Sequence, residues 1–334
     1  MKNQLRVVGV IALVLSVILV VGFLPISSYS FSPGNAIAVA NQIHIAAEPD
    51  LNKQGKVLMT DVILTQLTPI TWLFDHFDST ISIYPAADIF GASNPSNLAT
   101  QQLGQMIDSK TAAVVAALSF AHIKYSTIPG ASVVATTPKT TPSILPGDLI
   151  VGVNGQKETT LSGVVSAIVA SGKKVKLTMV RASTQVGNPN TLTVVGVKYK
   201  ASGRQILGIS LQAGEAVKLQ RPVTISTGQI GGPSAGLAFT LGVLQAMGVL
   251  HIKAGGVIAA TGTIDPTGAV GDVGGVRQKT IAVARAGAKV FLVPPQEVAA
   301  AKSDHIAGLK IVPVATLTQA LHYLSVASLA TVAR

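Results

Sequence analysis

The stretch GGPSAG at residues 231–236 constrains the fold more than any other part of the chain, because it joins two elements of different kind. A β-like run, VTI at 223–225, precedes it, and a strongly apolar helix beginning LAF at 237 follows. Ser234 therefore lies at a loop-to-helix junction, where its hydroxyl is exposed beside backbone N–H groups that have no partner within the helix. Because acyl transfer needs a nucleophile and donors for an oxyanion, the stretch predicts a nucleophilic serine.

A histidine is the first kind of base that could serve Ser234. The pattern G-x-S-x-G at residues 232–236 matches the nucleophile elbow of α/β-hydrolases, which needs a downstream acid and then a histidine. The residues that fill those slots by chain order are Asp265, Asp272 or Asp304, and His305 or His322. Pro233 suits the first turn of a helix better than a strained elbow. An α/β-hydrolase esterase is therefore kept only as an alternative.

Lys279 is the second candidate base, on a helix predicted over residues 276–286. It lies in register with the apolar positions of that helix, which are Val276, Ala282, Val283 and Ala286. A lysine on an apolar stripe either reaches out to water or is desolvated. Desolvation lowers the pKa of a lysine, which a general base near neutral pH requires. The pattern alone leaves both outcomes open.

Composition excludes several other kinds of chemistry. The 334 residues are enough for two domains, and 48% hydrophobic against 12% charged residues indicates folded structure. With no cysteine, thiolate catalysis and cysteine-based metal sites are excluded. Asp75, His76 and Asp78 are interpreted as the polar face of a short helix, so no metal or other cofactor is expected. The net charge is +11, but Lys and Arg are scattered and aromatics are 4%, so no nucleic-acid partner is expected.

Residues 7–24 form an uncharged, nearly all-apolar segment. As a helix it would rise about 27 Å, close to the hydrocarbon thickness of a bilayer. Lys2 and Arg6 precede the segment and no charge follows before Glu48, so the positive-inside rule puts the bulk of the chain outside the cytoplasm. A cleaved signal peptide is the alternative, but the A-x-A pattern at 38–40 lies far beyond the apolar end. We expect a single-pass anchor in the cytoplasmic membrane with an extracytoplasmic main part.

Residues 129–200 have the pattern of a separate, β-rich module. The run LPGDLIVGVNG at 145–155 is followed by a predicted helix over 161–170 and strands over 174–180 and 191–197. A β-rich module with one short helix suits the binding of extended peptides by strand addition. The run resembles L-x-G-D-x-I-x-x-V-N-G of PDZ domains of the bacterial protease type. That resemblance implies peptide binding near the carboxylate-binding loop, which falls at Tyr125, Ser126, Thr127 and Ile128.

Two segments taken together resemble the Lon-type peptidase domain. G-P-S-A-G stands at residues 232–236, and T-G-x-[VI] at 261–264 precedes G-G-x-x-x-K at 274–279. The resemblance implies that Ser234 is the nucleophile and Lys279 the base. It also implies that the Thr261 hydroxyl supports the dyad, and that backbone donors for the oxyanion lie near Gly232, Pro233 and Ser234.

The run LGQMIDSKTAA at 103–113 resembles the first long helix of the same domain, so the PDZ-like module would be an insertion. The predicted fold class is α+β: a Lon-type proteolytic domain with an inserted β-rich PDZ domain, preceded by one transmembrane helix. The predicted divisions are a cytoplasmic stub and anchor at 1–26, a first peptidase part at 42–122, the PDZ domain at 123–200, and the catalytic part at 201–334. This order resembles the membrane-anchored YlbL type.

The sequence thus predicts a membrane-anchored serine endopeptidase that acts on protein or peptide substrates. No G-x-x-x-x-G-K-[ST] loop occurs in the 334 residues, so cleavage is expected to be ATP-independent. The Lon family often has an acid three residues before the serine, where this chain has Gly231. A non-catalytic PDZ scaffold therefore stays open as an alternative, and so does homo-oligomerisation. The sequence does not specify a substrate or a cleavage preference.

Overall fold

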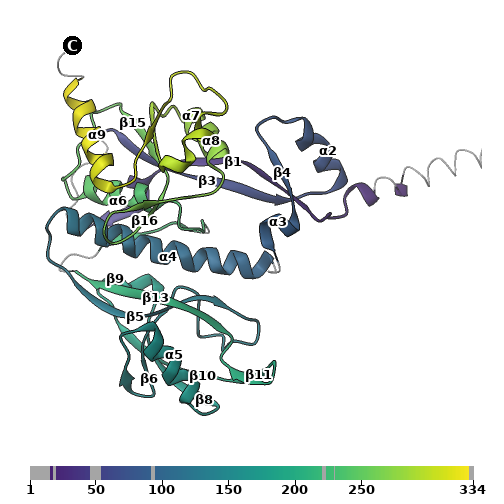
Figure 1. Cartoon of the computed structure of the whole chain (residues 1–334), viewed down its shortest axis with the longest axis vertical. Coiled ribbons are helices and arrows are strands. Elements are labelled where there is room, and N and C mark those ends of the chain that lie inside the picture. The colour runs from purple at the N-terminus through teal and green to yellow at the C-terminus, as the bar shows by residue number, and fades with distance from the viewer. Residues whose placement is uncertain are drawn as a thin grey trace, which may run out of the picture.

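The computed structural model describes residues 16–17, 20–45, 54–91, 95–219, 223–228 and 230–330 (Figure 1). The expected anchor at residues 1–26 lies mostly outside this part of the chain. In the described residues, no helix combines the length and the apolar character that crossing a membrane requires. The fold is a mixed α+β fold, as the sequence predicts.

A six-stranded sheet is the framework of the larger unit, with strand order β19-β18-β15-β3-β1-β4. β3, β15, β18 and β19 are parallel, whereas β1 and β4 extend the sheet in antiparallel fashion. The bounds are β1 Ser28–Ala38, β3 Lys56–Gln66, β4 Ser82–Pro85, β15 Val257–Ala260, β18 Val290–Val293 and β19 Lys310–Pro313. Small pairs flank it: β2 Ile43–Ile45 with β14 Val223–Ile225, and β16 Thr263–Ile264 with β17 Val270–Gly271.

Helices cover both faces of this sheet, because successive side chains of each strand point to opposite faces. Val57 and Met59 of β3 pack in the core that holds α4, α6 and α9. Leu58, between them, packs in a second core with α7 and α8. The bounds are α4 Pro95–Phe120, α6 Gly236–Ala246, α7 Val276–Arg285, α8 Val298–Lys302 and α9 Leu317–Ala330. Two short helices, α2 Pro69–Phe77 and α3 Ala86–Phe90, stand beside β4.

A seven-stranded sheet forms the second unit, which lies against α4 (Figure 1). Its order is β10-β8-β6-β5-β13-β9, with β7 paired to β6, and α5 packs on it. The bounds are β5 Ser126–Thr136, β6 Leu149–Val153, β7 Gln156–Lys157, α5 Leu161–Ala170, β8 Lys174–Val180, β9 Val186–Gly187, β10 Thr191–Val197 and β13 Ile209–Lys218. A hairpin, β11 Tyr199–Ala201 with β12 Arg204–Ile206, extends from it.

Two local expectations differ from the structure. β13 falls in the part predicted as catalytic, 201–334, yet it pairs with β5 along its whole length and so lies in the sheet of the second unit. The helix expected to start at Pro233 begins three residues later, as α6. The reason is a turn at residues 234–235, in which the Ser234 carbonyl accepts hydrogen bonds from the Gly262 N–H and the Thr261 hydroxyl.

Candidate active site

Ser234 lies half-buried in the turn directly before α6. All eleven residues of α6 are buried, so the turn is attached to the most enclosed helix of the larger unit. The Ser234 carbonyl accepts from the Gly262 N–H at 2.9 Å, which ties the turn to the segment after β15. Gly262 has a φ of +148°, a conformation that side chains rarely adopt, and a Cβ there would lie 2.6 Å from Val270. Ser234 is therefore held by a backbone hydrogen bond to the segment after β15 and by its attachment to the buried helix α6.

Lys279 is almost completely buried, with 3% of its surface exposed. It projects from the first turn of α7, which begins after Gly275 in the left-handed conformation. Burial lowers the pKa of Lys279 to about 8, while the negative charges of Glu297 and Asp61 act in the opposite direction. Of the two outcomes that the sequence leaves open, the structure therefore has the desolvated lysine.

Thr261 stands between the two candidate residues, just beyond the carboxyl end of β15. The Lys279 ammonium donates to the Thr261 hydroxyl at 3.4 Å, and that hydroxyl donates to the Ser234 carbonyl at 3.2 Å. Among the described residues, no hydrogen bond joins the Ser234 hydroxyl to the Lys279 amine directly. In this conformation Thr261 thus links the Lys279 amine to the backbone of Ser234.

One cavity of about 530 Å³ contains both Ser234 and Lys279 on its wall. The wall is formed by β1, β3, α3, α4, the loop before α6 and the loop before α7. Its lining residues are Phe31, Asn35, Ile37, Met59, Thr60, Asp61, Val62, Leu64, Ile89, Leu98, Gln102, Met106, 230–235, Gly274 and Lys279. It is mostly apolar with a few polar groups, which is the usual character of a site that binds a substrate chain.

Asp61 is a functional candidate that the sequence prediction missed. It stands in β3, whose pattern by itself indicates only a strand, and it is the one carboxylate in an otherwise apolar and neutral stretch. The structure shows why it is special: β1 has an irregularity between Pro33 and Ala36, and the Asn35 N–H there donates to the Asp61 carboxylate at 2.6 Å. The stretch around Ser234, residues 231–236, contains no acidic residue. The negative charge near Lys279 comes instead from Asp61 and Glu297.

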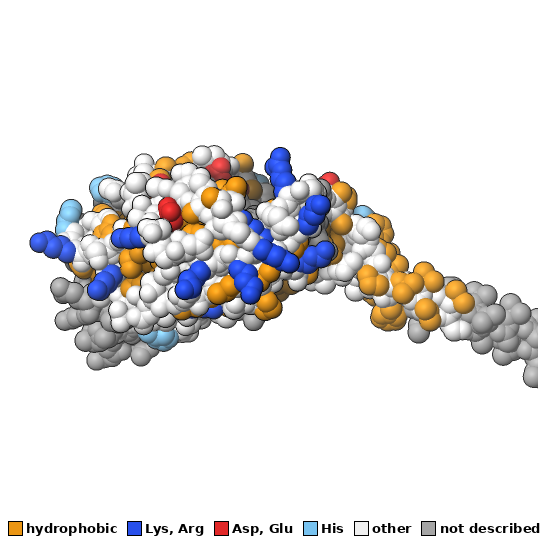
Figure 2. Space-filling view, turned by 90° about the horizontal axis from the view of Figure 1, so that it is seen from below, with side chains coloured by type: hydrophobic (Ala, Val, Ile, Leu, Met, Phe, Trp, Pro, Cys, Tyr) orange, Lys and Arg blue, Asp and Glu red, His pale blue; other side chains and the backbone are white. Residues whose placement is uncertain are grey.

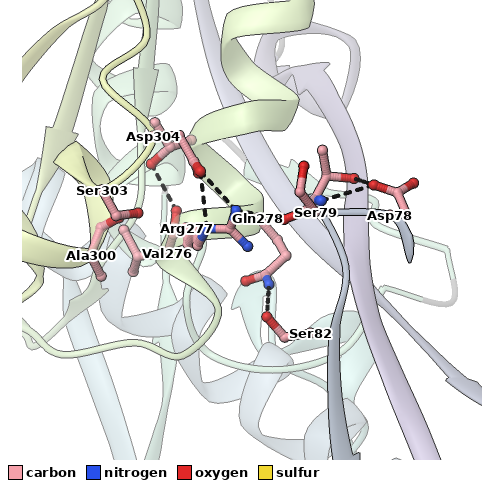
Figure 3. Close-up of polar contacts among 11 residues, drawn as sticks. Asp78, Ser79, Ser82, Val276, Arg277, Gln278, Ala300, Ser303 and Asp304 are labelled. Atoms are coloured by element: carbon pink, nitrogen blue, oxygen red, sulfur yellow. Dashed lines mark hydrogen bonds and ion pairs between the residues drawn. The ribbon is translucent and has the colours of Figure 1, made fainter. Parts of the chain in front are cut away.

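Two polar residues of α7 directly before Lys279 form hydrogen bonds with other elements (Figure 3). Arg277 donates to the Asp304 carboxylate at 2.7 Å and to the Ser79 carbonyl at 2.6 Å. Gln278 donates to the Ser82 hydroxyl of β4 at 2.8 Å. These contacts tie α7 to β4 and to the loop before it, next to Lys279 in the chain.

The expected oxyanion donors need revision. The Gly232 N–H already donates to the Gln102 carbonyl of α4 at 2.8 Å, and Pro233 has no N–H. Within the described part of the chain, the N–H groups of Ser234 and Ala235 have no acceptor. They are therefore the donors that this geometry leaves for an oxyanion.

The other predicted site residues lie elsewhere. Ser126, Thr127 and Ile128 are in strand β5 and pair with β13, rather than forming a loop. Tyr125 packs against the core of the larger unit, and its hydroxyl lies 2.9 Å from that of Ser119. Peptide binding by this stretch stays a prediction.

No histidine lines the cavity around Ser234, as far as the described residues go. The two histidines that chain order allowed, His305 and His322, are both exposed. The esterase alternative therefore has no histidine base beside Ser234 among the described residues. The described residues also contain no cluster of three or more potential metal ligands.

A comparison with curated proteins found no match. In a comparison with protein families, residues 220–326 match the Lon protease (S16) C-terminal proteolytic domain. The matched range includes Ser234, Thr261 and Lys279. Residues 220–326 are thus similar to the proteolytic domain of a Lon-type serine peptidase.

Proposed function

We propose that this protein is an ATP-independent serine endopeptidase with Ser234 as nucleophile and Lys279 as general base. The observation that carries the proposal is the desolvated Lys279 on the wall of the same cavity as Ser234. A lysine must lose its proton before it can accept one, and an amine in water does so only near its ordinary pKa of 10.5. With a pKa of about 8, roughly a tenth of Lys279 is neutral at pH 7.

The reaction follows from these positions. The neutral Lys279 amine removes the proton from the Ser234 hydroxyl as its oxygen attacks the peptide carbonyl carbon. The N–H groups of Ser234 and Ala235 stabilise the oxyanion that forms. The Lys279 ammonium then protonates the leaving amine, and water hydrolyses the acyl-enzyme by the same base. The hydrogen bond from Lys279 to Thr261 orients the amine between these steps.

The remaining parts of the proposal concern substrate and place. Residues 7–24 anchor the chain in the cytoplasmic membrane, with the catalytic unit outside the cytoplasm. The second unit selects peptide segments as a PDZ domain does, a role that its sheet-and-helix build supports. Because the chain contains no nucleotide-binding loop, its substrates are flexible or unfolded segments of exported or membrane-associated proteins.

Single substitutions test the dyad. Lys279→Ala should lower kcat/KM for a flexible peptide by about 10²- to 10⁴-fold, the usual contribution of a general base, and Ser234→Ala should abolish covalent labelling. Lys110→Ala is a matched control: burial also lowers the Lys110 pKa to about 8, but this lysine lines a different cavity, so activity should stay.

Full activity of either dyad variant would refute the mechanism. The scaffold alternative has one observation in its favour, the missing direct hydrogen bond between Ser234 and Lys279 among the described residues. It predicts that Ser234→Ala retains its bound partners and causes no loss of processing in the cell. Loss of processing with retained partners would exclude the scaffold.

A further inference from the structure

Helix α2 has an apolar surface that the described part of the chain leaves exposed. Six of its nine residues are apolar, and none of the nine is buried. The exposed fractions are 39% for Trp72, 51% for Leu73, 71% for Phe74 and 80% for Phe77. A helix this short is not stable alone in water and normally depends on burying its apolar face. Something outside the described residues must therefore cover this one.

The N-terminal apolar segment reaches the described structure directly beside α2. A Cβ on Gly22 would lie 2.8 Å from the Ile70 side chain, so the two segments are in close contact. The Ile26 N–H donates to the Leu67 carbonyl at 2.8 Å, immediately before α2. The segment is itself exposed and apolar, with Phe23 at 63%. The two surfaces are thus continuous.

This end of the molecule has a character of its own (Figures 1 and 2). α2 stands beside β4, at the edge of the six-stranded sheet where the N-terminal segment leaves the fold. In the view of Figure 2, Lys and Arg side chains lie over the body, and hydrophobic side chains gather on the narrow end. The exposed large hydrophobic residues of this end are Val17, Val20, Val21, Phe23, Leu24, Ile63, Leu64, Trp72, Leu73, Phe74, Phe77 and Tyr84.

We infer that α2 lies in the headgroup region of the membrane, as a second contact beside the N-terminal anchor. The occupant is a lipid surface because the apolar face continues into 18 uncharged residues, 7–24, long enough to span a bilayer. Trp72, Leu73, Phe74 and Phe77 suit the interface, where tryptophan is enriched and amphipathic helices insert their apolar side. The inference rests on the proposed membrane attachment and not on the proteolytic chemistry.

Trp72 allows a direct test, because it is the single tryptophan of the chain. The full chain is reconstituted in vesicles of phosphatidylcholine and phosphatidylglycerol, and its tryptophan fluorescence is recorded. Trp72 should emit at shorter wavelength than in a denatured sample, resist quenching by acrylamide, and be quenched when the phosphatidylcholine carries bromine on its acyl chains. The measurement uses the natural sequence, so no variant has to fold.

The matched control moves the tryptophan to Val169 of α5, which is 73% exposed, in a Trp72→Phe, Val169→Trp chain. There the tryptophan should be quenched by acrylamide and not by brominated lipid. Phe74→Asp with Phe77→Asp should remove the lipid quenching of Trp72 and leave cleavage of a soluble peptide unchanged. A failure of the Ser234–Lys279 mechanism would not alter any of these fluorescence results.

Three outcomes would overturn the inference. In the first, the chain sediments with vesicles but Trp72 is as accessible to acrylamide as the control tryptophan. In the second, Trp72 is protected only at high protein concentration and brominated lipid has no effect, which means that a second copy covers α2. In the third, the full chain does not sediment with vesicles, and the proposed anchor then fails as well.

Discussion

Lys279, the proposed base, is a buried lysine whose environment comes from distant parts of the chain. Its own helix provides the apolar surroundings, and this much the sequence pattern predicts. The carboxylates of Asp61 and Glu297 that act on it could not be predicted, because they lie 218 (279 − 61) and 18 (297 − 279) residues away in the chain. The same limit applies to Gln102, whose carbonyl takes the N–H of Gly232. Such contacts depend on tertiary structure, which no local pattern contains.

The burial of Lys279 should have a cost in stability that depends on pH. Its pKa falls from 10.5 to about 8 on folding, so between these values the unfolded chain holds a proton that the folded chain lacks. Below pH 8 this opposes folding by on the order of 3 kcal/mol, and the opposition disappears as the pH rises to 10.5. Lys279→Met should therefore be inactive but more stable than the natural protein at pH 7.

Urea unfolding of both proteins at pH 7 and at pH 10 checks this expectation. The advantage of Lys279→Met should shrink at the higher pH. The exposed Lys289, changed to Met, is the control and should show no such trend. An equal or lower stability of Lys279→Met at pH 7 would contradict the proposed desolvation.

At the scale of the element, one turn of helix α4 contacts both the loop before α6 and strand β5. The Gln102 carbonyl accepts a hydrogen bond from the N–H of Gly232, in the loop before α6. Two residues later, Gly104 lies so near β5 that a Cβ there would be 2.8 Å from the Val134 carbonyl oxygen. Glycine weakens a helix interior, so its place here is explained by the close approach of β5.

Gly104→Ala tests that explanation, because two effects of opposite sign compete. Helix propensity favours alanine by about 1 kcal/mol, whereas contact with a backbone oxygen costs about 1–3 kcal/mol. We expect net destabilisation, together with faster amide hydrogen exchange in β5. Gln105→Ala, on the same helix, should change the free energy of unfolding by less than about 0.5 kcal/mol. A Gly104→Ala protein more stable than the natural one would show that β5 has room to move.

The sequence predicted the elements best where a strong local pattern had clear ends. The expected bounds of α5, β8 and β10 match the structure. The start of α6 was wrong, because hydrogen bonds to the Ser234 carbonyl hold the turn before it. The sequence analysis did not assign β13 to the sheet of the second unit, because strand pairing is non-local. No pattern within residues 209–218 indicates that β5 is the partner strand.

At the scale of the whole molecule, the two units meet through a polar link in their interface. Asp108 of α4 accepts hydrogen bonds from Ser132 of β5, at 2.9 Å, and from Gln212 of β13. Burial raises the pKa of Asp108 from 3.8 to about 6, and the two hydrogen bonds only partly oppose this. The contribution of this contact to the free energy of unfolding should thus change with pH between about 3.8 and 6.

The sign of that sensitivity follows from proton binding. Between pH 3.8 and 6 the folded protein holds a proton on Asp108 that the unfolded chain has lost, so this contribution to stability falls as the pH rises. Asp108→Asn, which stays neutral, should therefore gain stability relative to the natural protein from pH 4 to pH 7. Urea unfolding at the two pH values measures the difference. Parallel behaviour of the two proteins would mean that Asp108 titrates as an exposed carboxyl does.

The close approach of α4 to the loop before α6 also bears on where this cavity can hold an acidic side chain. A Cβ at position 231 would lie 3.0 Å from the Cβ of Gln102, so an acidic side chain there would push the helix away. The helix cannot yield easily, since Gly104 already touches β5. Asp61, on β3, lines the same cavity as Gly231 and Gln102. The cavity thus takes its acidic side chain from β3, and the position beside Gln102 is left to the packing of α4 against this loop.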